Sequence, residues 1–244
     1  MGKKVIAINS SKRKKNTYGL LIELKEQLKP LDIHMDIIHL HDYSIKACAG
    51  CEACIMTDRC PIQDDSQKLM KKLLTYDGIV IGSPVYMNQV SGMLKNFFDR
   101  TCKWAHRPAL YGVPMLFVIS TAGSGIKATS KYLKNVALQW GAFPTDTIGR
   151  KVSTMDKKIV PEEYNKFLQH LAMPMEHYRP SFGQIIYFSV YKALALKLLD
   201  IDRNYWVEKG WHQKAYFFDS RLHPLKKLFG HLFFKRLYRK INKV

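Results

Sequence analysis

The sequence predicts an α/β protein with a doubly wound, five-stranded parallel sheet and a helical, basic C-terminal extension. Three observations support this prediction. Strand and helix patterns alternate over about 150 residues, which implies right-handed βαβ crossovers. That alternation stops near residue 153, and no acidic residue follows Asp219. We therefore expect one domain over 1–152 and a second region, the extension, over 153–244.

Short apolar runs bounded by polar or turn residues predict the strands of this sheet. They occupy 3–9, 33–40, 79–81, 113–120 and 145–152. Apolar residues at helical spacing predict the connecting helices. These run from Thr17 to the helix-ending Pro30, and over 66–76, 91–101 and 127–140.

The extension has a different pattern. We expect a helix over 161–171, and prolines interrupt 173–183. The segment 225–241 repeats apolar residues at helical spacing among lysines and arginines. Its Phe and Leu side chains need burial, so packing on protein is the expectation, and peripheral contact with an anionic membrane is the alternative. No recognition motif supports nucleic-acid binding, and we expect none.

The chain carries a large excess of positive charge. Lys and Arg number 39 against 20 Asp and Glu, which gives a formal net charge of +19. This charge favours an anionic partner, but charge alone does not distinguish a phosphorylated cofactor from an acidic protein, anionic lipid or nucleic acid. The sequence shows no secretory signal and no apolar run long enough to span a bilayer. We therefore expect a cytoplasmic protein.

Ligands of open parallel sheets bind outside the carboxyl ends of the strands. That rule selects the loops at 10–17, 84–91 and 121–125. The first loop, SSKRKKNT, joins a strand to a helix. A helix N-terminus surrounded by hydroxyls and basic side chains makes a phosphate site. A capped helix behind a solvated basic loop is the competing interpretation, since Asn16 or Thr17 would be a good N-cap.

The second loop adds a more specific motif. GSPVY at 82–86 is followed by SGMLKNFFDR at 91–100. Together they resemble the flavodoxin-like NAD(P)H-dependent FMN reductases, and especially their iron–sulfur flavoprotein branch, over roughly the first 150 residues. The segment from Asn9 to Thr17 is also similar to that family's phosphate loop. It departs from the family at Asn9, where Gly is usual, and at Ser11, where Pro is frequent.

The resemblance implies a flavodoxin-like sheet of order 2-1-3-4-5 that binds FMN. The residues that it assigns to the FMN phosphate are Ser10, Ser11, Asn16 and Thr17. Those that it places along the isoalloxazine edge are Pro84, Val85, Tyr86 and Asn88, and those that complete the pocket are Thr121, Ala122 and Gly123. Lys95, Asp99 and Arg100 are expected to be structural, as a helix-face ion pair and a contact that closes the fold.

Four of the five cysteines lie in one loop, expected over 46–65, with the spacing Cys48-x2-Cys51-x2-Cys54-x5-Cys60. Thiolates at such spacing can surround one iron–sulfur cubane. Zinc and a metal-free, redox-sensing loop are the alternatives. The arrangement is similar to the cysteine motif of iron–sulfur flavoproteins, which implies a four-iron, four-sulfur (4Fe-4S) cluster that exchanges electrons with FMN. The fifth cysteine, Cys102, is expected to be a buried structural thiol.

These features favour an FMN-dependent oxidoreductase or electron-transfer flavoprotein that relays electrons between the cluster and FMN. NAD(P)H or an acidic ferredoxin is the expected donor, and a homo-oligomer the expected assembly. A clusterless NAD(P)H-dependent FMN or quinone reductase is the first alternative. A non-enzymatic flavin-binding electron carrier is the second. No residue is assigned an acid–base role.

Overall fold

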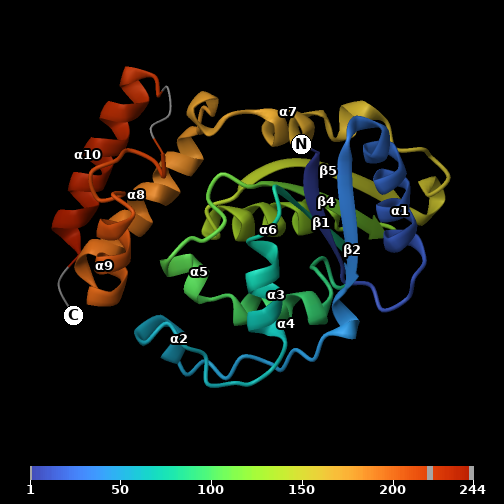
Figure 1. Ribbon diagram of the computed structural model, residues 1–244, viewed down its shortest axis with the longest axis horizontal. Coiled ribbons are helices and arrows are strands. Elements are labelled where there is room, and N and C mark those ends of the chain that lie inside the picture. The colour runs from blue at the N-terminus through green and yellow to red at the C-terminus, as the bar shows by residue number, and fades with distance from the viewer. Residues whose placement is uncertain (1, 219–221, 242–244) are drawn as a thin grey trace.

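A computed structural model describes residues 2–218 and 222–241 and contains one five-stranded sheet (Figure 1). Its strands are β1 (Lys3–Asn9), β2 (Ile33–His39), β3 (Gly78–Pro84), β4 (Pro114–Thr121) and β5 (Phe143–Lys151). All neighbouring strands are parallel, and their order is β2-β1-β3-β4-β5. This order is that of flavodoxin-like folds, so the predicted fold class is confirmed.

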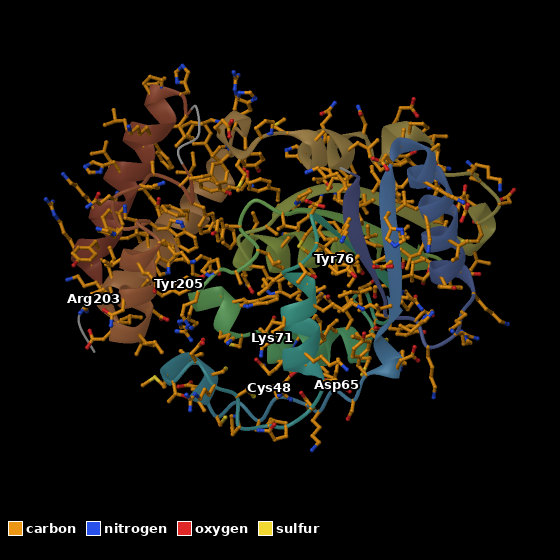
Figure 2. The ribbon with its side chains drawn as sticks, viewed as in Figure 1. Cys48, Asp65, Lys71, Tyr76, Arg203 and Tyr205 are labelled. Atoms are coloured by element: carbon orange, nitrogen blue, oxygen red, sulfur yellow. The ribbon has the colours of Figure 1, made fainter. Side chains whose placement is uncertain are left out.

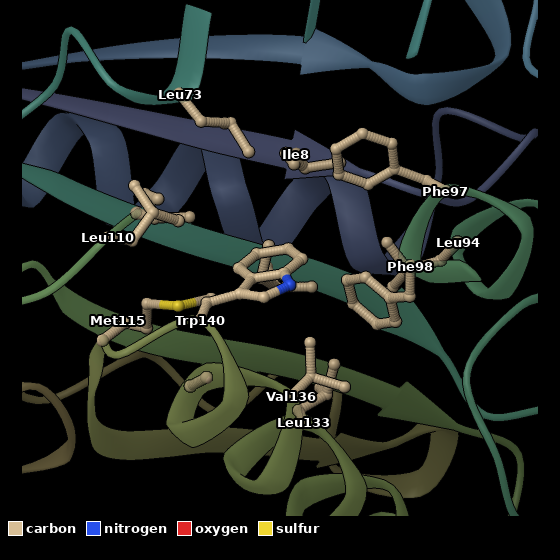
Figure 3. Close-up of a cluster of buried hydrophobic side chains, with 14 of the residues drawn as sticks. Ile8, Leu73, Leu94, Phe97, Phe98, Leu110, Met115, Leu133, Val136 and Trp140 are labelled. Atoms are coloured by element: carbon tan, nitrogen blue, oxygen red, sulfur yellow. The ribbon is translucent and has the colours of Figure 1, made fainter. Parts of the chain in front are cut away.

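The central strands are buried on both faces, as expected of a parallel sheet covered by helices. Every residue of β3 and β4 is buried. One face is covered by α1 (Asn16–Leu28) and α7 (Asn165–Ala172). The other is covered by α3 (Ser66–Leu73), α4 (Gly92–Arg100) and α6 (Ile126–Gln139). Figure 3 shows Trp140 at the centre of this second core, between α4, α6 and the sheet.

The strand register brings the predicted loops together. Asn9, the last residue of β1, pairs with Gly82 near the end of β3. Pro84, the last residue of β3, pairs with Ser120 of β4. The loops that follow β1, β3 and β4 therefore leave the same edge of the sheet side by side. The third strand is longer than predicted, because Gly82, Ser83 and Pro84 continue the ladder beyond the apolar triplet.

The extension has two parts with different partners. Residues 159–171 pack on the sheet, where Ile159, Tyr164, Phe167 and Leu171 join the core beneath α1. The predicted helix of this part is a short 3-10 turn followed by α7. The rest forms α8 (Phe182–Lys197), α9 (Asp200–Glu208) and α10 (Pro224–Lys240), which lie together at one side of the molecule (Figure 1).

Helices α8 and α9, the segment that follows α9 and the start of β5 share a third, aromatic core. Its buried members include Phe143, Phe188, Trp206, Trp211 and Phe217. Helix α10 packs on α8 at Gly230, where an added Cβ would lie 2.8 Å from the Ile185 side chain. The basic helix α10 therefore packs on protein, as expected for the segment 225–241, although Leu225, Leu228 and Leu232 stay exposed. In the described part of the chain no helix is both long and apolar enough to cross a membrane.

Candidate functional site

A cavity of about 330 Å³ opens at the carboxyl edge of the sheet. Eight of the eleven residues assigned to the cofactor line it: Ser11, Asn16, Thr17, Pro84, Val85, Tyr86, Thr121 and Ala122. The remaining lining residues are Arg13, Lys15, Ser120 and Val152. The three loops chosen from the sequence thus meet in one cavity, and the segment after β5 joins them.

The N-terminus of α1 faces this cavity without a side-chain cap. Asn16 is its first residue, and the preceding Lys15 makes no capping hydrogen bond. The interpretation of Asn16 or Thr17 as N-cap is therefore wrong. Thr17 Oγ1 instead lies 2.6 Å from Ser120 Oγ, which ties the helix to β4. The first N–H groups of a helix have no intrahelical partner, so this end presents donors and a positive dipole to an anion.

The loop after β3 is a tight hairpin. Tyr86 and Gln89 exchange two backbone hydrogen bonds of 2.9 Å around Met87 and Asn88. These two central residues have φ of +50° and +61°, as in the two-residue turns that favour Asn. Tyr86 is 51% exposed at the cavity, whereas Met87 at the tip is 97% exposed.

Three assigned residues do not line the cavity. Asn88 forms the hairpin turn, and its carbonyl accepts a hydrogen bond from Thr129 Oγ1. Gly123 donates its N–H to Thr121 Oγ1 and shapes the turn behind the cavity. Ser10 is buried, its N–H donates to the Gly82 carbonyl, and its Oγ has no partner in the structure. These positions shape the loops from behind.

Four residues that line the cavity were not predicted from the sequence to bind the cofactor. Arg13 and Lys15 belong to the predicted phosphate loop, and their charge was already visible there. Ser120 is the second-last residue of β4, and its partner Thr17 could not be known from the sequence. Val152 follows β5, which the strand order puts next to β4. The signal for Val152 was therefore the predicted sheet order.

The cysteine loop contains little regular structure. Between β2 and α3 the regular structure is a 3-10 turn (Leu40–Asp42) directly after β2 and the four-residue helix α2 (Ala53–Met56). Figure 2 shows Cys48 on this loop, which runs below α3 and α4 in that view. Side chains from other elements hold the loop in place.

Arg100 of α4 holds the end of the loop that carries Cys60. Its buried guanidinium donates to Asp64 Oδ2 at 2.5 Å and to the Cys60 sulfur at 3.2 Å. It also donates to the carbonyls of Lys46 and Ile62 at 3.2 and 3.1 Å. Arg100 is thus the structural contact that the sequence predicted. Lys95 and Asp99 form the expected ion pair, at 2.6 Å, on the outer face of α4.

Arg107, which follows α5 (Lys103–His106), holds the other part of the loop. Its guanidinium donates to the Cys54 carbonyl at 2.6 Å and to the Ile55 carbonyl at 3.2 Å. The same group pairs with Asp202 of α9, which is 2% exposed. His106 Nδ1 lies 2.9 Å from the second Asp202 oxygen. The C-terminal extension therefore supplies the buried counter-ion of an arginine that binds the cysteine loop.

The cysteine thiols lie close enough to influence one another electrostatically. The pKa of the Cys54 thiol is raised, first by burial and then by Cys60, Cys48 and Cys51. In residues 2–218 and 222–241, however, no three His, Cys, Asp or Glu side chains are gathered as metal ligands. The donor set has the chemistry of an iron–sulfur site, and its geometry in this structure is open.

Cys102 differs from the prediction. It is exposed, and with Cys48 and Gly50 it lines a hollow of about 560 Å³ between the cysteine loop, α4 and α6. The pKa of its thiol is raised by partial burial and then by Cys54 and Cys48. The expectation of a buried structural thiol was wrong because Cys102 lies in the turn between α4 and α5, where its side chain lines this hollow and is not packed into the core.

A doubly wound sheet whose first helix presents an uncapped N-terminus to a cavity at the switch point defines a mononucleotide-binding α/β protein. Residues 3–152 match the family of NADPH-dependent FMN reductases. The chain belongs to that family.

Several relatives are iron–sulfur flavoproteins. One from Archaeoglobus fulgidus is 46% identical over 98 residues, which cover 40% of this chain and 48% of that protein. One from Methanocaldococcus jannaschii is 38% identical over 99 residues, covering 40% and 51%. One from Clostridioides difficile is 28% identical over 225 residues, covering 84% and 98%. The chain spans about half the length of the first two relatives.

Solved structures with the same fold include a flavone reductase and RosB. The flavone reductase has a TM-score of 0.52 at 18% identity and covers 68% of this chain and 59% of that chain. RosB, solved with bound 8-demethyl-8-formylriboflavin-5'-phosphate, has a TM-score of 0.51 at 13% identity and covers 62% and 66%. At these identities the likeness shows the fold alone.

Proposed function

We propose that this protein is an FMN-dependent oxidoreductase whose flavin occupies the cavity at the carboxyl edge of the sheet. The observation that carries the proposal is the uncapped N-terminus of α1, which opens into a cavity also lined by the loops after β3 and β4. Membership of the NADPH-dependent FMN reductase family supports it.

The cavity residues fit FMN by their chemistry. The first N–H groups of α1 and the hydroxyls of Ser11 and Thr17 would bind the phosphate, and Arg13 and Lys15 would add positive charge. Tyr86 and the neighbouring Pro84 and Val85 would lie against the isoalloxazine. Bound FMN supplies hydride and single-electron transfer. The chain itself would contribute binding and orientation of the flavin.

Cys48, Cys51, Cys54 and Cys60 would hold a 4Fe-4S cluster, and the similarity to iron–sulfur flavoproteins supports this part of the proposal. Their thiols share one loop, and two guanidinium groups donate to that loop, one of them to the Cys60 sulfur itself. Positive charge beside thiolates stabilises their ionised, ligating form. Such a cluster would supply single-electron transfer. Binding would require the loop to close from the open geometry of this structure.

The open geometry is also the specific observation that favours a second function. A clusterless NAD(P)H-dependent FMN or quinone reductase would need no convergence of the four sulfurs. One curated relative, from Geobacillus thermodenitrificans, is a NAD(P)H-dependent FAD/FMN reductase, 29% identical over 93 residues.

The partners follow from charge and exposure. NAD(P)H is the proposed donor for the family activity, and an acidic ferredoxin would suit the +19 surface. The exposed Leu225, Leu228 and Leu232 among the cations of α10 are the basis for a proposed peripheral membrane contact. The exposed Tyr86 and Met87 hairpin beside the cavity is the basis for a proposed homo-oligomer.

The test is a visible spectrum of protein purified without oxygen, before and after acid release of its chromophore. Flavin bands plus a shoulder that dithionite bleaches, with about four iron and four sulfide per chain, would establish the clustered function. Flavin bands without iron would establish the clusterless reductase. Protein that is colourless and does not take up added FMN would refute both.

A further inference from the structure

The C-terminal extension contains a second cavity that shares no residue with the flavin cavity. It has a volume of about 380 Å³ and lies between α8, α10 and the loop after α9. Its position on the extension puts it outside the region that matches the reductase family. Its lining residues come from three separate segments, so the packing of α10 on α8 creates it.

The cavity contains a buried positive charge. Lys192 of α8 is 8% exposed and lines the cavity. Its Nζ donates to the Lys214 carbonyl at 2.9 Å and lies 4.6 Å from the centre of the Phe234 ring. Among residues 2–218 and 222–241, no ion pair includes Lys192 and no carboxylate lines the cavity. A buried ammonium whose partners among these residues are one carbonyl and one ring is costly, and burial lowers the pKa of Lys192 to about 8.

The other residues that line the cavity are of two chemical kinds, apolar and basic. Phe188, Phe234 and Leu228 form an apolar wall, and Lys227 and His231 add basic groups from α10. Leu228 is also 55% exposed, so the apolar wall continues to the surface of α10. A ligand that complements both the basic and the apolar residues carries an anionic head for Lys192 and an apolar body for the aromatic wall.

We propose that this cavity binds a small amphipathic anion, such as a medium-chain carboxylate, whose head pairs with Lys192. The apolar body lies against Phe188 and Phe234, between α8 and α10. The site requires nothing of the flavin cavity, and its occupation and that of the flavin site are measured separately.

The test is isothermal titration of the FMN-loaded full chain with octanoate, 1-octanol and octylammonium. We expect octanoate to saturate one site, octanol to bind at least about tenfold more weakly, and octylammonium not to bind. In Lys192→Met, which keeps the length and apolar stem of the side chain, octanoate affinity should fall by at least about tenfold. Equal affinities for octanoate and octanol would overturn the proposal.

Two variants separate the cavity from general surface charge. Lys197→Met removes a lysine from the same helix that stacks on Tyr238 outside the cavity, and it should leave octanoate affinity unchanged. Lys227→Met removes an exposed cation at the cavity mouth and should weaken binding by about twofold to fivefold. Equal losses in Lys192→Met and Lys197→Met would refute a site at this cavity. Near-ultraviolet circular dichroism of each variant, which reports the packing of the aromatic core of the extension, shows that the fold is intact.

Discussion

The flavin cavity and the cysteine loop are both parts of one redox site as proposed, yet they are built in opposite ways. The cavity residues lie at or just after the carboxyl ends of the strands, and the register of the parallel sheet brings these ends to one edge. The cysteine loop has almost no regular structure. It is held by Arg100, Arg107 and, through Arg107, by Asp202 of the extension.

The comparison shows two ways in which a protein fixes the positions of its site residues. Backbone ladders fix the cavity at low cost, because their hydrogen bonds are made in any case by the sheet. The loop relies on desolvated ion pairs, which are strongly destabilising when one partner is lost. Mutations in the two regions should therefore differ in kind: gradual loss of affinity at the cavity, and sharp loss of structure at the loop.

The largest expected effect is that of Arg100→Met. Removing this guanidinium leaves Asp64 buried with no counter-ion and frees the Cys60 sulfur and two carbonyls. We expect the free energy of unfolding to fall by about 3–5 kcal/mol, measured by urea denaturation. The matched control is Lys95→Met on the same helix, whose exposed ion pair with Asp99 should contribute about 0–1 kcal/mol.

A loss as small as that of the control would show that Arg100 does not hold the loop. The double variant Arg100→Met, Asp64→Asn adds a second check. It removes the uncompensated charge and should recover part of the lost stability, because the penalty lies largely in the buried carboxylate.

Asp202→Asn should have the next largest effect, on metal retention. The change removes the buried negative partner of Arg107 while keeping a similar side-chain shape, and leaves the exposed Asp58 as a counter-ion. The guanidinium that binds the Cys54 carbonyl therefore loses its buried anchor. If the cluster is present, iron retention against a chelator should weaken by about 10-fold or more, as for other outer partners of metal ligands. FMN affinity should not change. Asp200→Asn, on the same helix but exposed and paired with Arg203, is the control; equal iron loss there would contradict a specific role for Asp202.

A smaller effect with a defined pH dependence is expected of Asp64→Asn. Burial alone would raise the pKa of Asp64, but hydrogen bonds from Ser66 and the Lys46 N–H, and the charge of Arg100, lower it overall. A lowered pKa contributes stability above the ordinary value of about 3.8, and that stability is lost as pH falls through the folded-state pKa. The variant should therefore be less stable than the parent by about 1–3 kcal/mol at pH 7. The difference should shrink in acid; a constant difference from pH 7 to pH 3 would contradict the assignment.

The sequence predicted the sheet and its cavity because both depend on local patterns. Apolar runs marked the strands, and the position of a loop after a strand was enough to place Ser11, Pro84 and Thr121 near one another. Boundaries were less accurate where polar or small residues continue a strand, as Gly82 and Ser83 do in β3.

The supports of the cysteine loop could not be predicted in the same way. Arg107 and Asp202 are 95 residues apart, and their pairing depends on where the extension packs. The position of Cys102 beside Cys48 depends on the path of an irregular loop. Neither has a periodic signal, so local pattern gave no information about them.

The smallest effect is expected at the cavity, from Lys15→Gln. Lys15 precedes the first turn of α1 and lines the cavity, so its charge adds to that of the helix N-terminus. The loss of one such partly exposed charge should weaken FMN binding by about twofold to fivefold, since terminal charge–dipole effects are about 0.3–1 kcal/mol. Lys25→Gln, at the opposite end of α1, is the matched control and should leave the Kd for FMN unchanged. The comparison of the cavity with the cysteine loop predicts that the backbone N–H groups of α1 carry most of the phosphate affinity. A hundredfold loss of FMN affinity in Lys15→Gln would contradict this prediction. It would show that the cavity, like the cysteine loop, depends on individual side-chain charges.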